Sequence, residues 1–311
     1  MQSYKEKREI AKSSYNFGVI CQRIGAIYTA TLRLLLYLCT RKQVNEDMNK
    51  TNKTALITGA SSGLGMELAR LHAANGDNLV LVARSIGKME KLKAELEKAY
   101  GIQVMIIGKD LSHADAPAQI YFEVKKAGIE IEYLINNAGF GGRGTFAERP
   151  MEQEMMMINV DIVALTKLTK LYLPEFISRG HGRILNVSSP AGEMPGPLQA
   201  VYYASKAYVT SLSNAIWYET KGTGVTVTTL LPGAMDSGFT RASDMQNTKL
   251  FEHMVSPAIV AKAGFDGMMQ GKMTVTGGLT FMQKIFTNMT HFIPKKLLMK
   301  QIYEMQQLKN S

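Results

Sequence analysis

The chain has 311 residues, 46% of them hydrophobic, which suits one large globular domain or two domains of ordinary size. Its formal charge of +10 lies mostly at the ends, because residues 1–47 carry eight Lys/Arg against four Asp/Glu and residues 272–311 carry six against one. The near-neutral body argues against a nucleic-acid partner, since basic residues should then mark a recognisable binding module.

Residues 17–40, FGVICQRIGAIYTATLRLLLYLCT, form the first predicted element and the one candidate membrane segment of the sequence. The run is long enough to span a bilayer, but Arg23 and Arg33 interrupt it. Polar residues at helical spacing form one stripe, which favours a helix that lies in the membrane interface. Two alternatives stay open: a spanning helix, or a chain that starts at Met48 and has no native residues 1–47.

Both cysteines, Cys21 and Cys39, lie in this segment. The rest of the chain therefore cannot form an internal disulfide, which fits a reducing compartment. We expect a cytoplasmic protein that is associated with a membrane if residues 17–40 bind one. The five histidines show no metal-ligand spacing, so no metal site is expected.

From Thr54 onward, short apolar runs alternate with segments of helical spacing. The strands, predicted from continuous apolar runs, cover residues 55–58, 78–83, 104–111, 131–139, 182–189, 225–233 and 272–277. The helices are predicted over 66–76, 88–101, 151–179 and from about Val201. Strands without polar alternation are typical of a parallel sheet that is covered on both faces. Right-handed crossovers then predict a single doubly wound, Rossmann-like α/β fold.

The first strand leads into the glycine-rich segment TGASSGLG, residues 58–65. Gly59 permits a tight turn, Gly63 lets the backbone approach a pyrophosphate, and Gly65 allows close packing of helix and sheet. The helix that follows presents free N–H groups to a phosphate. This turn predicts a dinucleotide site with the cofactor-binding residues Thr58, Gly59, Ser61, Ser62, Gly63, Leu64 and Gly65.

The second strand ends in Ala83 and Arg84, where a site for NAD would carry an acid to hold the ribose hydroxyls. A guanidinium at this place can clamp a 2′-phosphate instead. NADPH/NADP+ is therefore the predicted cofactor, in preference to NADH.

Seven motifs follow one another in the order of a known family. They are TGASSGLG, KDL at 109–111, NNAG at 136–139, INV at 158–160, NVSS at 186–189, YYASK at 202–206 and LPGAMDS at 231–237. With these motifs the chain resembles the classical short-chain dehydrogenases/reductases of the NADP-preferring type, over roughly residues 52–280. The resemblance implies a dehydrogenase domain over 48–285, between the N-terminal extension 1–47 and a basic amphipathic tail over 286–311.

The resemblance also implies roles for individual residues. Tyr202, four residues before Lys206, is similar to the family's acid/base, Ser189 to its catalytic serine, and Asn159 to its structural and proton-relay asparagine. Tyr203 and Tyr208 are expected to be packing or surface aromatics. The further cofactor-binding residues implied, besides Tyr202 and Lys206, are Asp110, Leu111, Asn137, Ala138, Gly139, Pro232, Gly233 and Ser237.

The chemistry of these side chains supports the assignment. An unperturbed tyrosine has a pKa of about 10, too high for an effective base near neutral pH. Lys206 lies one helical turn beyond Tyr202, so its charge is expected to lower the pKa of the phenol. In a reduction Tyr202 would give its proton to the carbonyl oxygen, while Ser189 donates a hydrogen bond to the same oxygen.

The substrate is less well defined by the sequence. Three segments are expected to line its pocket at the carboxyl ends of the strands: 139–144, 190–200 and the stretch after Pro232. Their methionines and phenylalanines favour a hydrophobic carbonyl compound, such as an acyl- or steroid-like ketone. The C-terminal stretch 281–311 could cover this pocket, pack on a partner subunit, touch a membrane or form an ordinary surface helix.

Two other classes of function stay open at this point: a non-catalytic NADP(H)-binding sensor and a membrane-associated scaffold. The complete set of Asn159, Ser189, Tyr202 and Lys206 argues against a sensor. By analogy with related dehydrogenases we expect a homodimer or homotetramer, with 151–179 and 201–221 as candidate pairing helices. The expected partners are therefore a small carbonyl substrate, further copies of the chain and a peripheral membrane contact.

Overall fold

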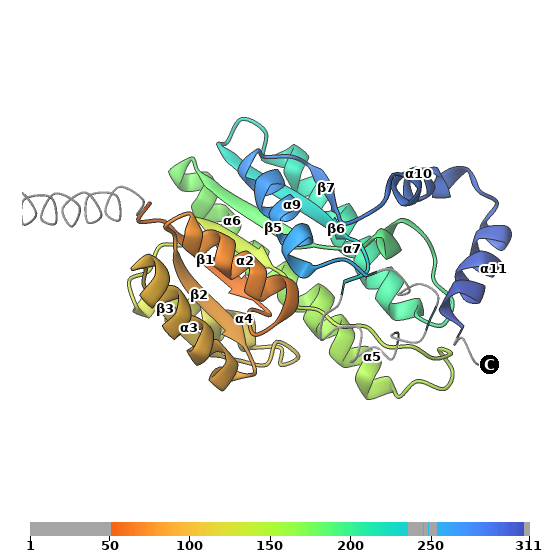
Figure 1. Cartoon of the computed structure of the whole chain (residues 1–311), viewed down its shortest axis with the longest axis horizontal. Coiled ribbons are helices and arrows are strands. Elements are labelled where there is room, and N and C mark those ends of the chain that lie inside the picture. Colours follow the sequence, from red (N-terminus) through yellow and green to blue (C-terminus); the bar gives the residue numbers. More distant parts are fainter. Residues whose placement is uncertain (1–50, 236–244, 246–247, 249–253, 308–311) are drawn as a thin grey trace, which may run out of the picture. The chain divides into compact units, whose positions relative to one another are not determined.

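A seven-stranded parallel sheet forms the centre of the molecule (Figure 1). The computed structural model describes residues 51–307 apart from 236–244, 246–247 and 249–253, and these belong to one compact unit, Lys50–Ser311. The strand order is β3-β2-β1-β4-β5-β6-β7, which confirms the predicted doubly wound fold. The strands are β1 (Thr54–Thr58), β2 (Asn78–Ala83), β3 (Val104–Gly108), β4 (Tyr133–Asn136), β5 (Gly182–Val187), β6 (Val225–Pro232) and β7 (Thr274–Gly277).

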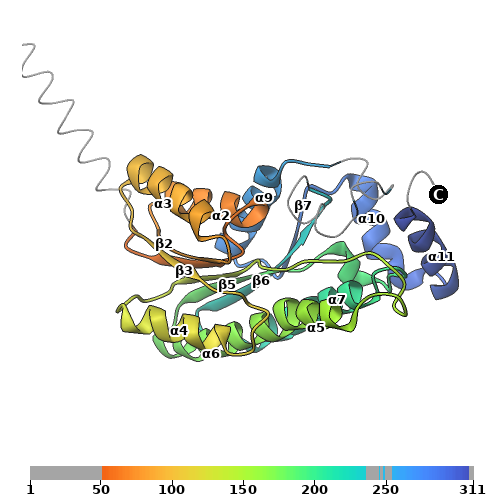
Figure 2. The ribbon, with the colours of Figure 1, turned by 90° about the horizontal axis from the view of Figure 1, so that it is seen from below.

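Helices cover both faces of the sheet, as Figure 2 shows. One face carries α2 (Gly63–Ala74), α3 (Ile86–Tyr100) and α9 (Pro257–Met269). The other face carries α4 (Ala116–Lys126), α6 (Leu165–Arg179) and α7 (Ala200–Glu219). Each face therefore has its own hydrophobic core, which explains why the strands are apolar on both sides.

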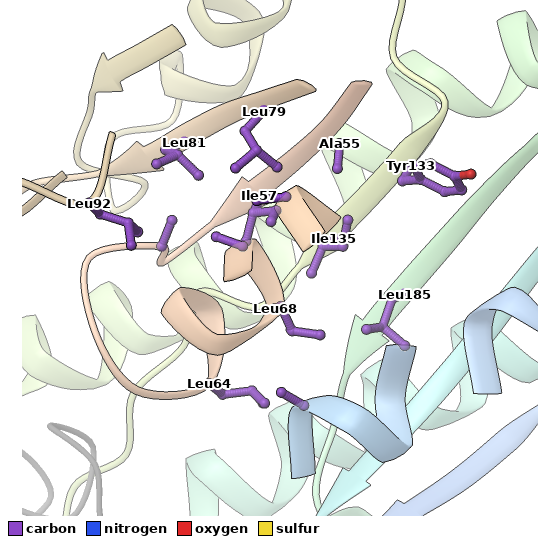
Figure 3. Close-up of a cluster of buried hydrophobic side chains, with 14 of the residues drawn as sticks. Ala55, Ile57, Leu64, Leu68, Leu79, Leu81, Leu92, Tyr133, Ile135 and Leu185 are labelled. Atoms are coloured by element: carbon purple, nitrogen blue, oxygen red, sulfur yellow. The ribbon is translucent and has the colours of Figure 1, made fainter. Parts of the chain in front are cut away.

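The core on the first face is built around β1 (Figure 3). Ile57 lies in register with Leu81 of β2 and with Ile135 of β4, and all three side chains are fully buried. Leu64 and Leu68 of α2 pack against this layer. Burial of apolar surface of this kind contributes about 25 cal/mol per Å2 and holds the start of α2 against the end of β1.

Two helical predictions need correction. The segment 151–179 is not one α-helix, because α5 (Met151–Ile158) and α6 are separated by a π-helical stretch, η1, over Asn159–Ala164. An apolar pattern continues through such a bulge, so periodicity does not reveal it. Helix α4 was missed, since Pro117 stands at its start and its buried residues are few.

Several predicted strands also run beyond the sheet. The strand expected over 131–139 is paired only over Tyr133–Asn136, and the one over 104–111 ends at Gly108. The residues that follow these strands leave the sheet and carry polar groups to its carboxyl edge. The predicted strands therefore continue past their paired residues into loops that line the site described below.

Beyond β7 the chain forms α10 (Phe281–Met289), the short 3-10 turn η4 (Thr290–Phe292) and α11 (Lys295–Gln306). A capping box starts α10, in which the Thr280 hydroxyl accepts from the Gln283 N–H and the Gln283 side chain accepts from the Thr280 N–H. Within the ranges given above, no helix is both long and apolar enough to cross a membrane. The segment 17–40 lies outside the described residues.

A buried polar network ties β4 and β5 to the helices beneath them. Asn136 Nδ2 donates to Thr169 Oγ1 at 3.0 Å and to Asn186 Oδ1 at 2.9 Å, and Asn186 Nδ2 donates to Ser213 Oγ at 2.9 Å. Such networks fix the packing of neighbouring elements because each buried polar atom needs its partner.

We expect Asn186→Ala to lower the free energy of unfolding by about 1–3 kcal/mol, because it removes two buried hydrogen bonds. Urea denaturation followed by circular dichroism measures this loss. The matched control is Asn288→Ala at an exposed position of α10, which should change stability by less than about 0.5 kcal/mol. Equal effects of the two substitutions would contradict a stabilising role for the network.

Candidate active site

A cavity of about 580 Å3 opens at the carboxyl edge of the sheet. It lies where the strand order reverses between β1 and β4, and the loops after β1, β2, β3, β4, β5 and β6 contribute to its wall. Crevices at this switch point are the usual ligand sites of open α/β sheets.

The turn between β1 and α2 forms one end of the cavity. Gly59 and Gly63 have positive φ angles of +68° and +55°. A Cβ atom on Gly65 would stand 2.4 Å from the Gly59 carbonyl oxygen and 2.5 Å from Asn137 Nδ2. The turn can therefore close only with glycines, and it leaves the N-terminus of α2 facing the cavity, a cradle that fits the diphosphate of a dinucleotide.

Thr58 holds this turn to the loop after β4. Its Oγ1 accepts from the N–H groups of Asn137 and Ala138, both at 3.0 Å, and Asn137 Nδ2 donates to the Thr58 carbonyl at 2.8 Å. Thr58 and Gly65 do not line the cavity themselves. Their contacts fix the backbone of the residues that do.

The loops after β2 and β3 place positive charge at the same end. Arg84 is 70% exposed, and its Nη1 lies 3.7 Å from Asp110 Oδ2. Burial tends to raise the pKa of Asp110, but hydrogen bonds from Ser112 and the charge of Arg84 bring it below its usual value. Lys88 and Lys109 also line this end of the cavity, although neither was among the predicted cofactor-binding residues.

Tyr202, Lys206 and Ser189 meet in the middle of the cavity. Tyr202 and Lys206 lie one turn apart on α7, and Lys206 Nζ is 5.7 Å from the centre of the Tyr202 ring. Ser189 follows β5 at the start of the 3-10 turn η2 (Pro190–Glu193), where its hydroxyl caps the turn and hydrogen-bonds Tyr202. The structure therefore brings these three predicted residues together.

Asp161, a residue that the motifs did not indicate, lies beside the lysine. Its Oδ2 is 3.4 Å from Lys206 Nζ and accepts from Ser205 Oγ at 3.1 Å, while its Oδ1 accepts from the Phe140 N–H at 3.2 Å. The carboxyl is fully buried, and this burial raises its pKa although Lys206, Phe140 and Ser205 oppose the shift. The π-helical stretch η1 carries Asp161 to this position.

The pKa of Tyr202 differs from the sequence-based expectation. Burial raises it, the hydrogen bond with Ser189 opposes this, and the nearby Asp161 carboxyl raises it further. The net shift is therefore opposite to the expected lowering of the Tyr202 pKa. Lys206 Nζ lies 3.4 Å from Asp161 Oδ2 and 3.3 Å from the Val187 carbonyl oxygen. A raised pKa favours the protonated phenol over the phenolate.

We expect Asp161→Asn to move the pH profile of catalysis to lower pH. Removing the carboxylate lowers the pKa of Tyr202. Reduction needs the protonated phenol, so its rate should fall at a lower pH than in the parent protein. Oxidation needs the phenolate, so its rate should rise at a lower pH. Rates in both directions between neutral and strongly alkaline pH measure the shift. Glu154→Gln, which changes a buried carboxyl paired with Arg149, is the control and should leave the profile in place.

Asn159 occupies the first position of η1, and its Nδ2 donates to the Ser112 carbonyl at 3.1 Å. It does not line the cavity. This bond joins the helix layer to the loop after β3, so the contact seen is structural. A relay role for Asn159 stays a prediction.

The outer half of the cavity is apolar and closed by the C-terminal helices. Leu298 and Ile302 of α11 form a buried cluster with Tyr203 and Ala191. Gln306 Nε2 donates to the Tyr203 hydroxyl at 3.0 Å. The packing role predicted for Tyr203 is thus observed, and the C-terminal stretch covers the pocket. Further apolar wall comes from Met156, Val160, Met194, Met235, Leu279, Phe286 and Met305.

Most predicted cofactor-binding residues line the cavity. They are Gly59, Ser61, Ser62, Gly63, Leu64, Arg84, Asp110, Leu111, Asn137, Ala138, Gly139, Pro232 and Gly233, together with Tyr202 and Lys206. Ser237 lies outside the described residues. Gln199 belongs to the segment 190–200 that was expected to line the pocket. It is buried in the cavity wall, and among the described residues its Nε2 has no hydrogen-bond partner.

This fold and this arrangement of side chains define a nucleotide-dependent dehydrogenase. Residues 53–248, more than half of the chain, match the sequence model for short chain dehydrogenases. The chain therefore belongs to the short-chain dehydrogenase family, a family of oxidoreductases.

The similar curated proteins include very-long-chain 3-oxoacyl-CoA reductases and a 17-beta-hydroxysteroid dehydrogenase. The chain is 34% identical over 223 residues to a very-long-chain 3-oxoacyl-CoA reductase-A of Danio rerio, covering 67% of this chain and 69% of the relative. It is 36% identical over 192 residues to 17-beta-hydroxysteroid dehydrogenase type 3 of Homo sapiens, covering 60% of each. With several other relatives, such as the human very-long-chain 3-oxoacyl-CoA reductase, the match spans only 58% of the relative's length.

Solved structures show the same architecture. A short-chain dehydrogenase from Sphingobium yanoikuyae in complex with NADPH superposes with a TM-score of 0.70 at 28% identity, over 83% of this chain and 99% of that one. A 7beta-hydroxysteroid dehydrogenase has a TM-score of 0.72 at 23% identity, over 81% and 96% of the two chains. The second likeness concerns the fold alone.

Proposed function

We propose that the protein is an NADP(H)-dependent oxidoreductase that interconverts a hydrophobic ketone and its secondary alcohol. The observation that carries this proposal is the single cavity that joins a phosphate cradle, the Ser189–Tyr202–Lys206 group and an apolar outer half. The phosphate cradle suits a dinucleotide, and the Ser189–Tyr202–Lys206 group suits a carbonyl oxygen. The apolar outer half suits a lipid-like substrate.

The cofactor would be held by the chain's own groups at three places. The turn at Gly59–Gly63 would take the diphosphate, and Arg84, with Lys88 and Lys109 nearby, would take a 2′-phosphate. Lys206 would hold ribose hydroxyls, as the family resemblance implies. When bound, the nicotinamide supplies the hydride for the carbonyl carbon. The relative solved with NADPH supports this preference over NADH.

The side chains of the chain perform the remaining chemistry. Ser189 donates a hydrogen bond to the substrate carbonyl oxygen and holds it beside Tyr202. Tyr202 transfers its phenolic proton to that oxygen as the alcohol forms. Because burial and Asp161 raise the pKa of Tyr202, the phenol stays protonated near neutral pH, which favours the direction of reduction.

The apolar outer half of the cavity supports an acyl- or steroid-like substrate. Methionines adapt to flexible chains, and Met156, Met194, Met235 and Met305 are spread around the wall. The names of the zebrafish and human relatives point to the same two substrate classes, long-chain 3-oxoacyl thioesters and steroid ketones.

A panel of ketones and 3-oxoacyl thioesters of increasing length, followed by NADPH absorbance, tests the proposal. We expect kcat/KM to rise with apolar length, since each buried methylene contributes about 0.8 kcal/mol, or about fourfold. NADPH binding without turnover of any carbonyl would instead support the sensor, the second candidate. A preference for small polar ketones would contradict the substrate class. A homodimer or homotetramer and a cytoplasmic location with membrane contact through residues 17–40 stay predictions.

A further inference from the structure

Helices α10 and α11 and the turn between them carry several exposed apolar side chains. Phe281 at the start of α10 is 76% exposed, and Phe292 between the two helices is 83% exposed. We call this the outer apolar surface, and it comprises Phe281, Met282, Ile285, Met289, Phe292, Leu297 and Tyr303. Figures 1 and 2 show both helices beyond the carboxyl edge of the sheet.

Helix α10 is apolar on two sides. Phe281, Ile285 and Met289 follow one another at steps of four and form an exposed stripe. Phe286 packs inward against the cluster of Leu298 and Ile302 and lines the cavity. A surface helix of a globular protein normally exposes polar residues to solvent. The exposed apolar stripe therefore indicates a surface that an apolar partner covers.

The charged residues of the segment 281–307 are almost all positive. Lys284, Lys295, Lys296 and Lys300 are exposed, whereas Glu304 is the one acid of residues 281–307. Glu304 Oε1 lies 4.0 Å from Lys300 Nζ, so its charge can offset only the charge of that lysine. Apolar side chains among exposed lysines suit a partner that is apolar inside and anionic at its surface.

We propose that the outer apolar surface docks onto an anionic lipid membrane. A second copy of the chain fits less well, because a contact between two copies of this surface would bring together two faces that each carry four lysines and one acid. A bilayer meets both requirements at once, since phenylalanines enter the boundary of the acyl chains while lysines stay among anionic headgroups. This docking is independent of residues 17–40.

The docked face also adjoins the active-site cavity. Phe286 and Met305 line the cavity and also a second hollow, which Gln301 and Glu304 complete. The same two helices therefore form the wall of the cavity on one side and the outer apolar surface on the other.

Tryptophan placed at single sites of the full chain tests the docking without any need for turnover. Phe281→Trp and Phe292→Trp report on the outer apolar surface, and Phe122→Trp on α4, where Phe122 is 67% exposed, is the matched control. The parent protein gives the background from its single tryptophan, Trp217. Vesicles of phosphatidylserine and phosphatidylcholine with brominated acyl chains quench any indole that enters the bilayer.

We expect the emission added at positions 281 and 292 to fall at least about twofold with these vesicles, and the emission added at 122 to stay unchanged. Lys295→Gln and Lys296→Gln should each weaken vesicle binding of the Phe281→Trp protein about fivefold. Equal quenching at 122 and 281, or none at 281 and 292, would overturn the proposal. A lipid-independent spectral change at 281 that grows with protein concentration would overturn it in favour of a second copy.

Discussion

Replacing Tyr202 by phenylalanine is expected to lower kcat by about 10³-fold, while NADPH binding changes little. The substitution removes the hydroxyl that gives a proton to the substrate and hydrogen-bonds Ser189. General acids of this kind contribute about 10²- to 10⁴-fold to enzymatic rates. The ring itself remains, so its packing beside Tyr203 is kept. Steady-state kinetics with a hydrophobic ketone and fluorescence titration with NADPH measure the two effects separately.

Tyr203→Phe is the matched control for this experiment. The Tyr203 hydroxyl accepts from Gln306 in the buried cluster under α11, away from the proton-transfer step. Its loss should cost about 1 kcal/mol of stability and leave kcat within a few-fold of the parent value. If Tyr203→Phe were inactive and Tyr202→Phe active, the assignment of the proton donor would be wrong.

Arg84→Asp is expected to abolish the preference for NADPH. In the parent protein we expect NADPH to bind at least about tenfold more tightly than NADH, equivalent to about 1.4 kcal/mol, from a charge-assisted contact with the 2′-phosphate. The introduced carboxylate would repel that phosphate, and it could accept hydrogen bonds from the ribose hydroxyls of NADH. Dissociation constants for both cofactors measure the change.

The control for charge reversal is Lys91→Asp, at an exposed position of α3 outside the cavity wall. It alters the net charge by the same amount and should lower the affinity for NADPH by less than about twofold at physiological salt, because screening weakens distant charges. Equal affinities for NADPH and NADH in the parent protein would contradict the assignment of Arg84. An equal loss of NADPH affinity in Arg84→Asp and Lys91→Asp would show a general effect of net charge instead.

The sequence predicted the sheet and the centre of the site because both depend on local patterns. Apolar runs defined the strands, and glycine spacing defined the turn at Gly59–Gly65. The spacing of Tyr202 and Lys206 placed both side chains on one turn of α7. Ser189 was assigned through the resemblance of its motif NVSS to the family, and it follows a strand that ends at the same edge of the sheet.

The parts that were missed depend on contacts between distant residues. Asp161 contacts Lys206 from within η1, and an apolar pattern does not reveal a π-helical stretch. The bond between Gln306 and Tyr203 joins positions 103 residues apart. Such contacts arise from the packing of whole elements, which the spacing of residues along one element does not determine.

Transfer of deuterium from labelled NADPH to a hydrophobic ketone tests the central claim most directly. The full chain is mixed with a long-chain 3-oxoacyl thioester or a steroid ketone and with NADPH deuterated at the nicotinamide C4 position, and the product is analysed by mass spectrometry. We predict one equivalent of the secondary alcohol per NADPH consumed. Deuterium should appear on the carbinol carbon for one of the two C4 label positions, and Tyr202→Phe should form the labelled alcohol about 10³-fold more slowly. Tight NADPH binding with no labelled alcohol from either C4 position would contradict the account.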